Sequence, residues 1–194
     1  MLSKYKQDLN RVILILAKPF MRVHPDILSV IGTLFPILFL YFMIQQKYLA
    51  ALVSFLGVFY DTVDGAVARA TGKVTKFGGL LDSTLDRISD SIYIISFYYA
   101  GIISIELTLM LLLSSYLISY IRSRAELAGK GSFVLNVGLI ERPERMIFLV
   151  SALIAELFAP GLAKYILIMM LILSVVTVLQ RMFKARSILA SIAD

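Results

Sequence analysis

The chain of 194 residues contains no cysteine and a single histidine, His24. Without cysteine it can form neither a disulfide nor a thiolate metal site, and one histidine excludes a metal centre built from several imidazoles. Charged residues are also scarce at 16%, whereas 59% of the residues are hydrophobic and the mean hydropathy is +0.86. A soluble domain of this length has too little interior to bury so much apolar surface. The composition therefore predicts an integral membrane protein.

The apolar residues are gathered into runs that recur along the whole chain. A membrane-spanning helix needs about 20 mostly apolar residues. We therefore expect an all-α integral membrane protein with one domain over residues 1–194. An N-terminal amphipathic helix at the membrane interface is predicted over 3–20, where apolar residues recur at helical spacing among lysines and arginines. The six transmembrane helices are predicted at roughly 26–46, 48–71, 78–100, 103–126, 141–159 and 162–186.

Proline and glycine mark the expected ends of these helices. Pro19 should end the interfacial helix, because the residue before a proline avoids helical geometry. Asp26 is predicted to cap the start of the first spanning helix. Gly72 and the pair Pro160–Gly161 should separate neighbouring helices, and residues 127–140 are too polar and glycine-rich to span a membrane.

The positive charges are distributed unevenly between the two sides of the predicted membrane. With six spanning helices, only Lys47 and Lys164 of the 19 lysines and arginines fall on the side opposite the termini. Because positively charged connections remain in the cytoplasm, this bias places both termini in the cytoplasm and the protein in the cytoplasmic membrane. A basic surface for nucleic acid does not require this segregation, so we exclude a nucleic-acid partner.

Four aspartates lie in one short stretch at the predicted cytoplasmic edge of the second and third spanning helices: Asp61, Asp64, Asp82 and Asp86. The first two are three residues apart and the last two are four apart, so each pair shares one helix face. Carboxylates are costly in hydrocarbon and repel one another, so a cation is expected among them. Hard oxygen ligands favour Mg²⁺, Mn²⁺ or Ca²⁺.

The spacing of these aspartates carries a family resemblance. The pattern Asp61-x2-Asp64-Gly65-x2-Ala68-Arg69-x8-Gly78-x3-Asp82-x3-Asp86 resembles the complete motif of the CDP-alcohol phosphatidyltransferases. The resemblance implies that a CDP-linked lipid and an alcohol react to give a phosphodiester-linked lipid and CMP. It also implies six membrane helices after an interfacial helix, and a homodimer.

The resemblance further implies roles for individual residues. One Mg²⁺ or Mn²⁺ ion is held by Asp61, Asp64 and Asp82, and a second by Asp61, Asp82 and Asp86. Asp86 also acts as the general base that takes the proton of the acceptor hydroxyl. The implied contacts to the CDP-lipid, either CDP-diacylglycerol or CDP-archaeol, are Gly65, Arg69, Thr75 and the turn His24, Pro25, Asp26 and Ile27.

Arginines later in the chain suggest the acceptor. A guanidinium binds phosphate through two hydrogen bonds, so arginines beside a metal site suit a phosphorylated alcohol. The segments SYIRSRAE and GLIERPER resemble the inositol-phosphate branch of the family, which implies 1L-myo-inositol 1-phosphate as the acceptor. The residues predicted to bind its phosphate are Arg122, Arg142, Arg145 and Arg181.

Three other functions remain as alternatives. Glycerol 3-phosphate is the nearest alternative acceptor, because it also presents a phosphate. Intramembrane prenyltransferases use aspartates and Mg²⁺, but their two aspartate-rich motifs lie far apart in sequence. A cation or proton transporter that uses the aspartates as its pathway would need access from both sides. It would not need the glycine, alanine and arginine positions of the motif.

Overall fold

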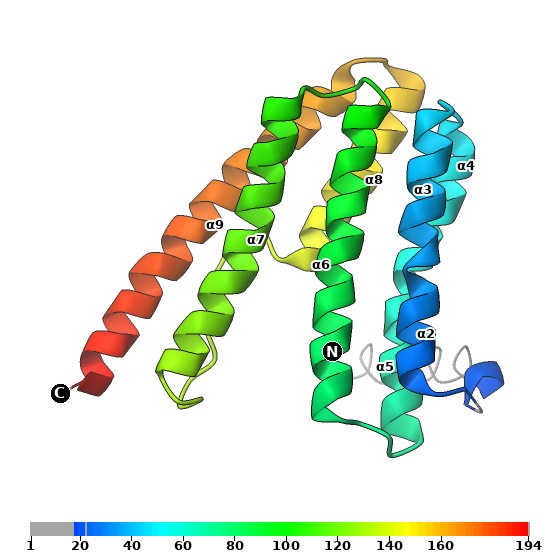
Figure 1. Ribbon diagram of the computed structural model, residues 1–194. Coiled ribbons are helices and arrows are strands. Elements are labelled where there is room, and N and C mark those ends of the chain that lie inside the picture. The colour runs from blue at the N-terminus through cyan, green and yellow to red at the C-terminus, as the bar shows by residue number, and fades with distance from the viewer. Residues whose placement is uncertain (1–17, 22, 194) are drawn as a thin grey trace, which may run out of the picture. The chain divides into compact units, whose positions relative to one another are not determined.

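The computed structural model describes residues 18–21 and 23–193, except for the side chains of residues 59–63, 192 and 193. All the regular secondary structure of this described part is helical (Figure 1). The predicted interfacial helix falls almost entirely on residues 1–17, which lie outside the described residues. Its last three residues, Lys18–Phe20, form the short 3₁₀ helix η1.

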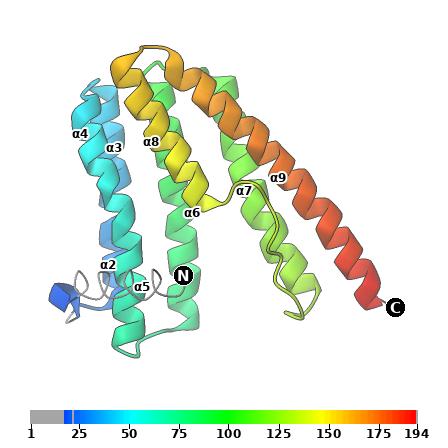
Figure 2. The same ribbon diagram turned by 180° about the vertical axis from the view of Figure 1, so that it is seen from behind.

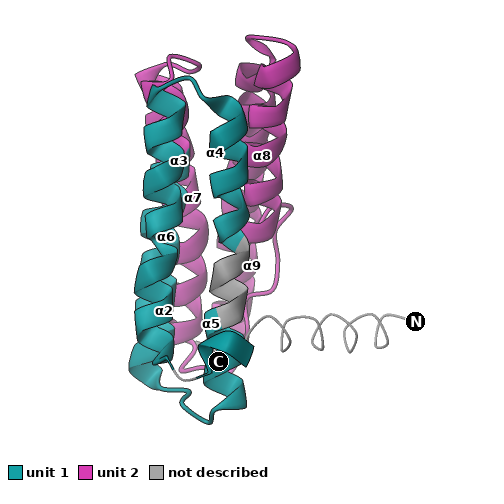
Figure 3. Cartoon of the chain, turned by 90° about the vertical axis from the view of Figure 1, so that its right-hand side faces the viewer, with its two compact units in different colours: residues 1–93 teal, residues 94–194 magenta. Residues whose placement is uncertain are grey.

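The chain divides into two compact units, residues 1–93 and 94–194, which are coloured separately in Figure 3. The long helix α6 contributes its first part to unit 1 and its last part to unit 2. Unit 1 also contains α2 (Pro25–Gly32), α3 (Leu34–Ile44), α4 (Tyr48–Phe55), η2 (Leu56–Phe59) and α5 (Tyr60–Ala70), and α6 itself covers Lys76–Tyr99. Unit 2 contains α7 (Ile105–Ala128), α8 (Arg142–Phe158) and α9 (Leu162–Ala193).

The start of the first membrane helix differs from the prediction. His24, in an extended conformation, is the N-cap residue, and Pro25 is the first helical residue. The prediction that Asp26 caps this helix was wrong, because Asp26 lies inside the first turn. The reason is the fixed φ of proline, which suits the first helical position and so moves the cap one residue upstream.

The same segment is interrupted at Thr33, where α2 ends and α3 begins. The cause is Pro36, three residues further along the chain. Pro36 has no N–H to donate to the carbonyl of Gly32, and its ring crowds that carbonyl. The predicted single helix over 26–46 is therefore divided into α2 and α3, which follow one another in line (Figure 1).

Two side-chain clusters hold unit 1 together. Phe39, Phe55 and Tyr93 pack against one another with ring centroids 4.8 to 5.7 Å apart, which joins α3, α4 and α6. Nearer the start of α2, Leu28 packs with Ala66 and Val67 of α5. Gly57 allows η2 to pack closely against α3, because a Cβ there would lie 2.0 Å from the Phe35 ring. These contacts place α2 beside α5.

Unit 2 is built around α9, which packs against both α7 and α8 (Figures 1 and 2). Ser104 caps α7 by accepting a hydrogen bond from the Leu107 N–H. The turn between α8 and α9 contains Gly161 at φ +90°, as the Pro160–Gly161 prediction requires. Both carboxylate oxygens of Glu156 accept from the Gly161 N–H, at 3.1 and 3.0 Å.

Within the part of the chain that the structure describes, three helical segments are long and apolar enough to cross a membrane. They are Pro25–Ile44, Ile105–Ala128 and Leu162–Ser191. Each has a large share of exposed apolar side chains, of which Leu109, Tyr165 and Ile172 are examples. Exposed apolar surface of this extent is expected where lipid, and not water, surrounds the helix.

Candidate active site

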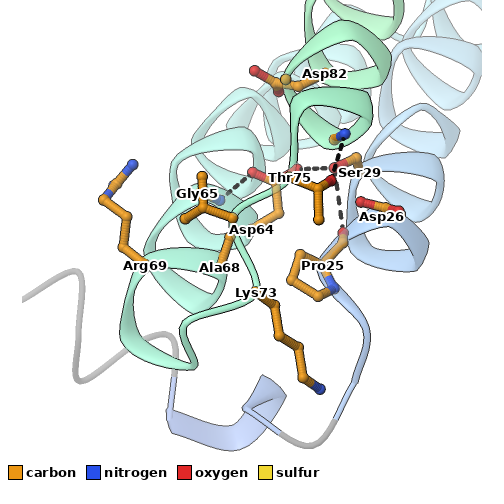
Figure 4. A pocket seen from close by; sticks show the side chains of 13 residues that line it. Pro25, Asp26, Ser29, Asp64, Gly65, Ala68, Arg69, Lys73, Thr75 and Asp82 are labelled. Atoms are coloured by element: carbon orange, nitrogen blue, oxygen red, sulfur yellow. Dashed lines mark hydrogen bonds between the residues drawn. The ribbon is translucent and has the colours of Figure 1, made fainter.

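A pocket of about 250 Å³ lies within unit 1, where α2, α5 and the start of α6 meet (Figure 4). Its lining contains two of the four motif aspartates together with both glycines that begin α6. The thirteen lining residues are Pro25, Asp26 and Ser29 from α2, Asp64, Gly65, Ala68 and Arg69 from α5, Lys73, Val74 and Thr75 from the connection, and Gly78, Gly79 and Asp82 from α6. Six of the eight motif positions thus line one pocket: Asp64, Gly65, Ala68, Arg69, Gly78 and Asp82.

Asp64 is the most constrained carboxylate of this pocket. It is 4% exposed, and both of its oxygens accept hydrogen bonds. Oδ1 lies 2.5 Å from the N–H of Gly65, and Oδ2 lies 2.5 Å from Oγ of Ser29 on α2. Distances of about 2.5–2.7 Å are typical of hydroxyl donors to ionised carboxylates. The side chain therefore has a defined orientation before any ligand arrives.

The two glycines that begin α6 have different surroundings. A Cβ on Gly78 would lie 3.0 Å from Oγ1 of Thr75 and 3.2 Å from Oδ1 of Asp26, whereas a Cβ on Gly79 would meet nothing within 4 Å. The Gly78 N–H also donates to Thr75 Oγ1 at 2.9 Å. Gly78 thus allows the start of α6 to approach α2 closely, while Gly79 leaves open space.

Two cationic side chains border the pocket. Arg69 lies one turn after Gly65 on α5, and Lys73 follows Gly72, whose φ of +67° ends the helix as predicted. Both are exposed, and Figure 4 shows the Lys73 side chain extending away from Asp64. Exposed cations at the rim of an acidic pocket are suited to bind an anionic group that enters it.

The remaining predicted residues of this site have separate positions. Asp86 lies one turn beyond Asp82 on α6 and is half-buried, but it is not among the residues that line the described pocket. His24 and Ile27 flank the pocket-lining turn, and His24 Nδ1 lies 3.6 Å from Oδ2 of Asp26. The side chain of Asp61 lies outside the described residues.

The donor set of the pocket fits a hard divalent cation. Among the described side chains, no group of three acidic or histidine residues is close enough to hold a metal. Asp64 and Asp82 nevertheless face one pocket and offer only oxygen donors, which Mg²⁺ and Mn²⁺ prefer.

Unit 2 holds the four predicted acceptor-binding arginines, and Arg181 is the most buried of them. It is 2% exposed, and three of its nitrogens donate to protein oxygens. These are the carbonyl of Val137 at 2.8 Å, the carbonyl of Ile118 at 2.7 Å and Oε1 of Glu141 at 2.6 Å. Arg181 thus joins α9 to α7 and to the α7–α8 connection.

Thr177, one turn before Arg181, holds the same connection. Its hydroxyl oxygen accepts from the N–H groups of Leu139 and Ile140, both at 3.1 Å. Gly138 has φ +145°, and a Cβ there would lie 2.6 Å from the Thr177 methyl group. The sequence predicted residues 127–140 only to be too polar and glycine-rich to span a membrane. In the structure this connection packs against α9 and is hydrogen-bonded to it.

The other three arginines occupy the ends of α7 and α8. Arg122 donates through Nε to Glu126 Oε1 at 3.1 Å, and the same oxygen accepts from the Leu135 N–H at 3.0 Å. Arg142 is the first residue of α8 and is half-buried, whereas Arg145 is 3% exposed. A second cavity, of about 180 Å³, lies beside this helix start and is lined by Asn136, Val137, Gly138, Leu139, Glu141 and Glu144.

Sequence reasoning missed several residues of these sites. Ser29 follows Pro25 by four residues and so shares its helix face, which was the available signal. Lys73 was not predicted to line the pocket, because the motif does not include it. The partners of Arg181 had no signal, because two of them are backbone carbonyls of distant segments.

Known proteins resemble this chain over nearly its whole length. A family model described as CDP-alcohol phosphatidyltransferase matches residues 22–185. The archaetidylinositol phosphate synthase of Pyrococcus horikoshii is 42% identical over 94% of this chain and 93% of its own. The phosphatidylinositol phosphate synthase of Mycobacterium tuberculosis, in a crystal structure with CDP-DAG bound, superposes with a TM-score of 0.79. That match has 30% identity and covers 90% of this chain and 94% of the mycobacterial one.

A second crystal structure of the mycobacterial enzyme contains manganese and citrate. It matches with a TM-score of 0.78 and 30% identity over 89% of this chain and 88% of that one. The chain therefore belongs to the CDP-alcohol phosphatidyltransferase family, and it is a multi-pass membrane protein. The family resemblance drawn from the aspartate motif is confirmed.

Proposed function

We propose that this protein transfers the phosphatidyl or archaetidyl group of a CDP-linked lipid to 1L-myo-inositol 1-phosphate and releases CMP. The observation that carries the proposal is the pocket of unit 1. It gathers Asp64, Asp82 and Arg69, three of the motif residues, around one volume together with the start of α2. The proposal is also supported by the 42% identity to an archaetidylinositol phosphate synthase over 94% of the chain.

Two divalent cations, Mg²⁺ or Mn²⁺, are proposed at this pocket. Asp61, Asp64 and Asp82 would hold one ion, and Asp61, Asp82 and Asp86 the other. When bound, such ions offset the charge of a diphosphate and of a departing phosphate. The manganese in the related mycobacterial structure supports a divalent cation in this family.

The chain's own side chains would bind and orient the CDP-lipid around these ions. Arg69 at the pocket rim would pair with a phosphate oxygen, and Gly65 would let the nucleotide approach the α5 backbone. Thr75 and the turn formed by His24, Pro25, Asp26 and Ile27 complete the proposed contacts. The CDP-DAG in the mycobacterial structure supports a CDP-lipid as the donor.

Asp86 is proposed as the general base of the reaction. Its carboxylate would accept the proton of the acceptor hydroxyl as that oxygen attacks the phosphorus atom of the lipid phosphate. A half-buried position on α6, one turn beyond Asp82, is compatible with contact to an acceptor that enters from solvent.

The acceptor phosphate is proposed to bind at Arg122, Arg142, Arg145 and Arg181. Arg181 already has three protein partners, so any contact to phosphate would use the remaining N–H bonds of its Nη atoms. Arg142, at the start of α8, is more exposed than Arg181. The names of the relatives support inositol phosphate as the acceptor.

We further propose six membrane spans within the single domain 1–194, preceded by an interfacial helix over 3–20. Both termini and the active site would face the cytoplasm, in the cytoplasmic membrane, as the lysine and arginine bias indicates. A homodimer is proposed from family resemblance.

The experiment is product analysis with purified protein in detergent. CDP-archaeol and CDP-diacylglycerol are each incubated with Mg²⁺ and one acceptor: inositol 1-phosphate, glycerol 3-phosphate or unphosphorylated inositol. We expect CMP and an inositol-phosphate lipid, identified by mass spectrometry, with the first acceptor alone. Turnover only with glycerol 3-phosphate would refute the inositol assignment, and CMP release with no acceptor dependence would refute the transfer reaction.

A further inference from the structure

Ser29 is the side chain of α2 that reaches across to a predicted metal ligand on α5. Its Oγ lies 2.5 Å from Oδ2 of Asp64 and 3.3 Å from the carbonyl oxygen of Pro25 in its own helix (Figure 4). The two residues are 35 positions apart in the sequence, and both line the pocket of unit 1. The contact therefore depends on the packing of α2 against α5.

The single hydroxyl proton of Ser29 can be donated to only one of these two acceptors at a time. The carboxylate is charged and is the nearer acceptor, so it takes the proton. A hydrogen bond from serine back to a carbonyl four residues earlier is the ordinary alternative within a helix. Here that alternative is long, which shows that the side chain is directed toward Asp64.

This hydrogen bond fixes the carboxylate of Asp64 from a second side. The Gly65 N–H holds Oδ1 and Ser29 holds Oδ2, so rotation about the Cβ–Cγ bond of Asp64 would break both interactions. The Gly65 donor lies next to Asp64 in the chain and constrains it only locally. Ser29 is the donor that ties the carboxylate to another helix.

We propose that Ser29 is a positioning residue that orients Asp64 for a divalent cation and thereby raises the affinity of the site for that cation. The inference rests on the proposed function, since it takes Asp64 as a metal ligand. Groups that hydrogen-bond to metal ligands orient them, and their removal typically lowers metal affinity about 10- to 100-fold. Ser29 lies on α2, and the first turn of α2 also lines the pocket. The same helix would therefore position both the proposed metal ligand and the proposed contacts to the nucleotide.

The test compares Ser29→Ala, Ser29→Thr and Thr33→Ala in the purified full-length protein. Thr33 is the matched control, because its exposed hydroxyl donates only to the Val30 carbonyl at 2.7 Å, one turn further along. Binding of Mn²⁺ is measured directly, by electron paramagnetic resonance of the free ion. Thermal stability and the Mn²⁺ dependence of CMP release are recorded on the same samples.

We expect Ser29→Ala to weaken Mn²⁺ binding about tenfold, Ser29→Thr to restore it, and Thr33→Ala to leave it unchanged. CMP release by Ser29→Ala should recover at high Mn²⁺ concentration, with an unchanged KM for the CDP-lipid. A purely structural role would lower the melting temperature without changing Mn²⁺ affinity, which would overturn the proposal. Wild-type protein that binds no Mn²⁺ would overturn it as well.

The two proposals fail in different ways. Wild-type protein that binds Mn²⁺ but releases no CMP would refute the proposed function. The effect of Ser29 on Mn²⁺ binding would still be judged from the resonance titrations of the variants.

Discussion

The two units of this chain use their charged side chains in different ways. In unit 1, Asp64 and Asp82 face a pocket whose rim carries exposed Arg69 and Lys73. In unit 2, the guanidinium of Arg181 is buried and is bound by Glu141 and two backbone carbonyls. Unit 1 thus presents its charges to an open pocket, whereas in unit 2 the charge of Arg181 holds a connection between helices.

The largest expected effect tests whether the aspartates of unit 1 perform chemistry. Asp86→Asn removes the proposed general base without changing its size. Because general-base catalysis contributes about 10²- to 10⁴-fold, we expect turnover to fall at least about 100-fold while CDP binding is retained. Turnover is measured by CMP release, and CDP binding by calorimetry. Near-normal turnover would remove Asp86 from this role.

A control for Asp86 lies on the same helix. Asp90 is 4% exposed and continues the stripe of Asp82 and Asp86, but it lies outside the motif. We expect Asp90→Asn to retain measurable turnover, even if the substitution lowers the stability of the protein. Equal losses in both variants would mean that this stripe is structural, and would weaken the contrast between the units.

The second effect tests whether the charge of Arg181 holds the fold. Arg181→Met removes the donor to the Ile118 and Val137 carbonyls and to Glu141, whose side chain is 40% exposed and can turn to water. A buried polar group left without its hydrogen bond costs about 1–3 kcal/mol. We expect a large fall in melting temperature in detergent. Arg181→Lys should rescue little, because one ammonium cannot reach three separated acceptors. Exposed Arg124→Met, the control, should change stability by less than about 0.5 kcal/mol.

The outcome for Arg181 also separates its two proposed roles. A variant that keeps its melting temperature but shows a higher KM for inositol phosphate would make Arg181 mainly an acceptor ligand. In that case Arg181 of unit 2 would also present its charge to a ligand, and the two units would not differ in this respect.

A third, smaller effect probes the shape of the pocket in unit 1. Gly78→Ala would place a Cβ 3.0 Å from Thr75 Oγ1 and 3.2 Å from Asp26 Oδ1. Thr75 and Asp26 both line the pocket and would have to shift, so we expect the KM for the CDP-lipid to rise about fivefold, which corresponds to about 1 kcal/mol. Gly79→Ala is the matched control and should leave it unchanged. Identical behaviour of the two variants would contradict the described closeness of α2 and α6.

The smallest effect concerns Arg122 and Glu126 in unit 2. Glu126→Gln keeps an oxygen for the Leu135 N–H but removes the charge that holds Arg122. Partly exposed ion pairs contribute less than about 1 kcal/mol, so stability should change little. If Arg122 binds the acceptor, the KM for inositol phosphate should rise about two- to fivefold. Glu106→Gln, at an exposed position, is the control. An unchanged KM for inositol phosphate in Glu126→Gln would exclude a role for Glu126 in positioning Arg122.

The helices and the motif could be predicted because their signals are local. The breaks at Gly72 and Gly161 lie between helices, as predicted, whereas α9 continues to Ala193, beyond its predicted end at residue 186. The spacing of Asp64 and Asp82 relative to Gly65 and Gly78 was enough to expect them around one site. Helix periodicity fixes which residues share a face, and that information is contained in the sequence itself.

The remaining features depend on packing between distant segments. The Ser29–Asp64 hydrogen bond exists only because Leu28 packs against Ala66 and Val67, which sets α2 against α5. Arg181 was predicted as a phosphate ligand from the family resemblance and the other arginines, and the sequence did not show that its side chain is buried. Its carbonyl partners, in Val137 and Ile118, have no side-chain signature at all.

The most direct test of the account is a divalent-cation titration of CMP release by the wild-type protein and by Asp64→Asn. With a CDP-lipid and inositol 1-phosphate present, the account predicts no CMP without Mg²⁺ or Mn²⁺ and saturable activation by either ion. It also predicts activity for Asp64→Asn that is at least about 100-fold lower at every metal concentration. Metal-independent CMP release, or full activity of Asp64→Asn, would contradict it.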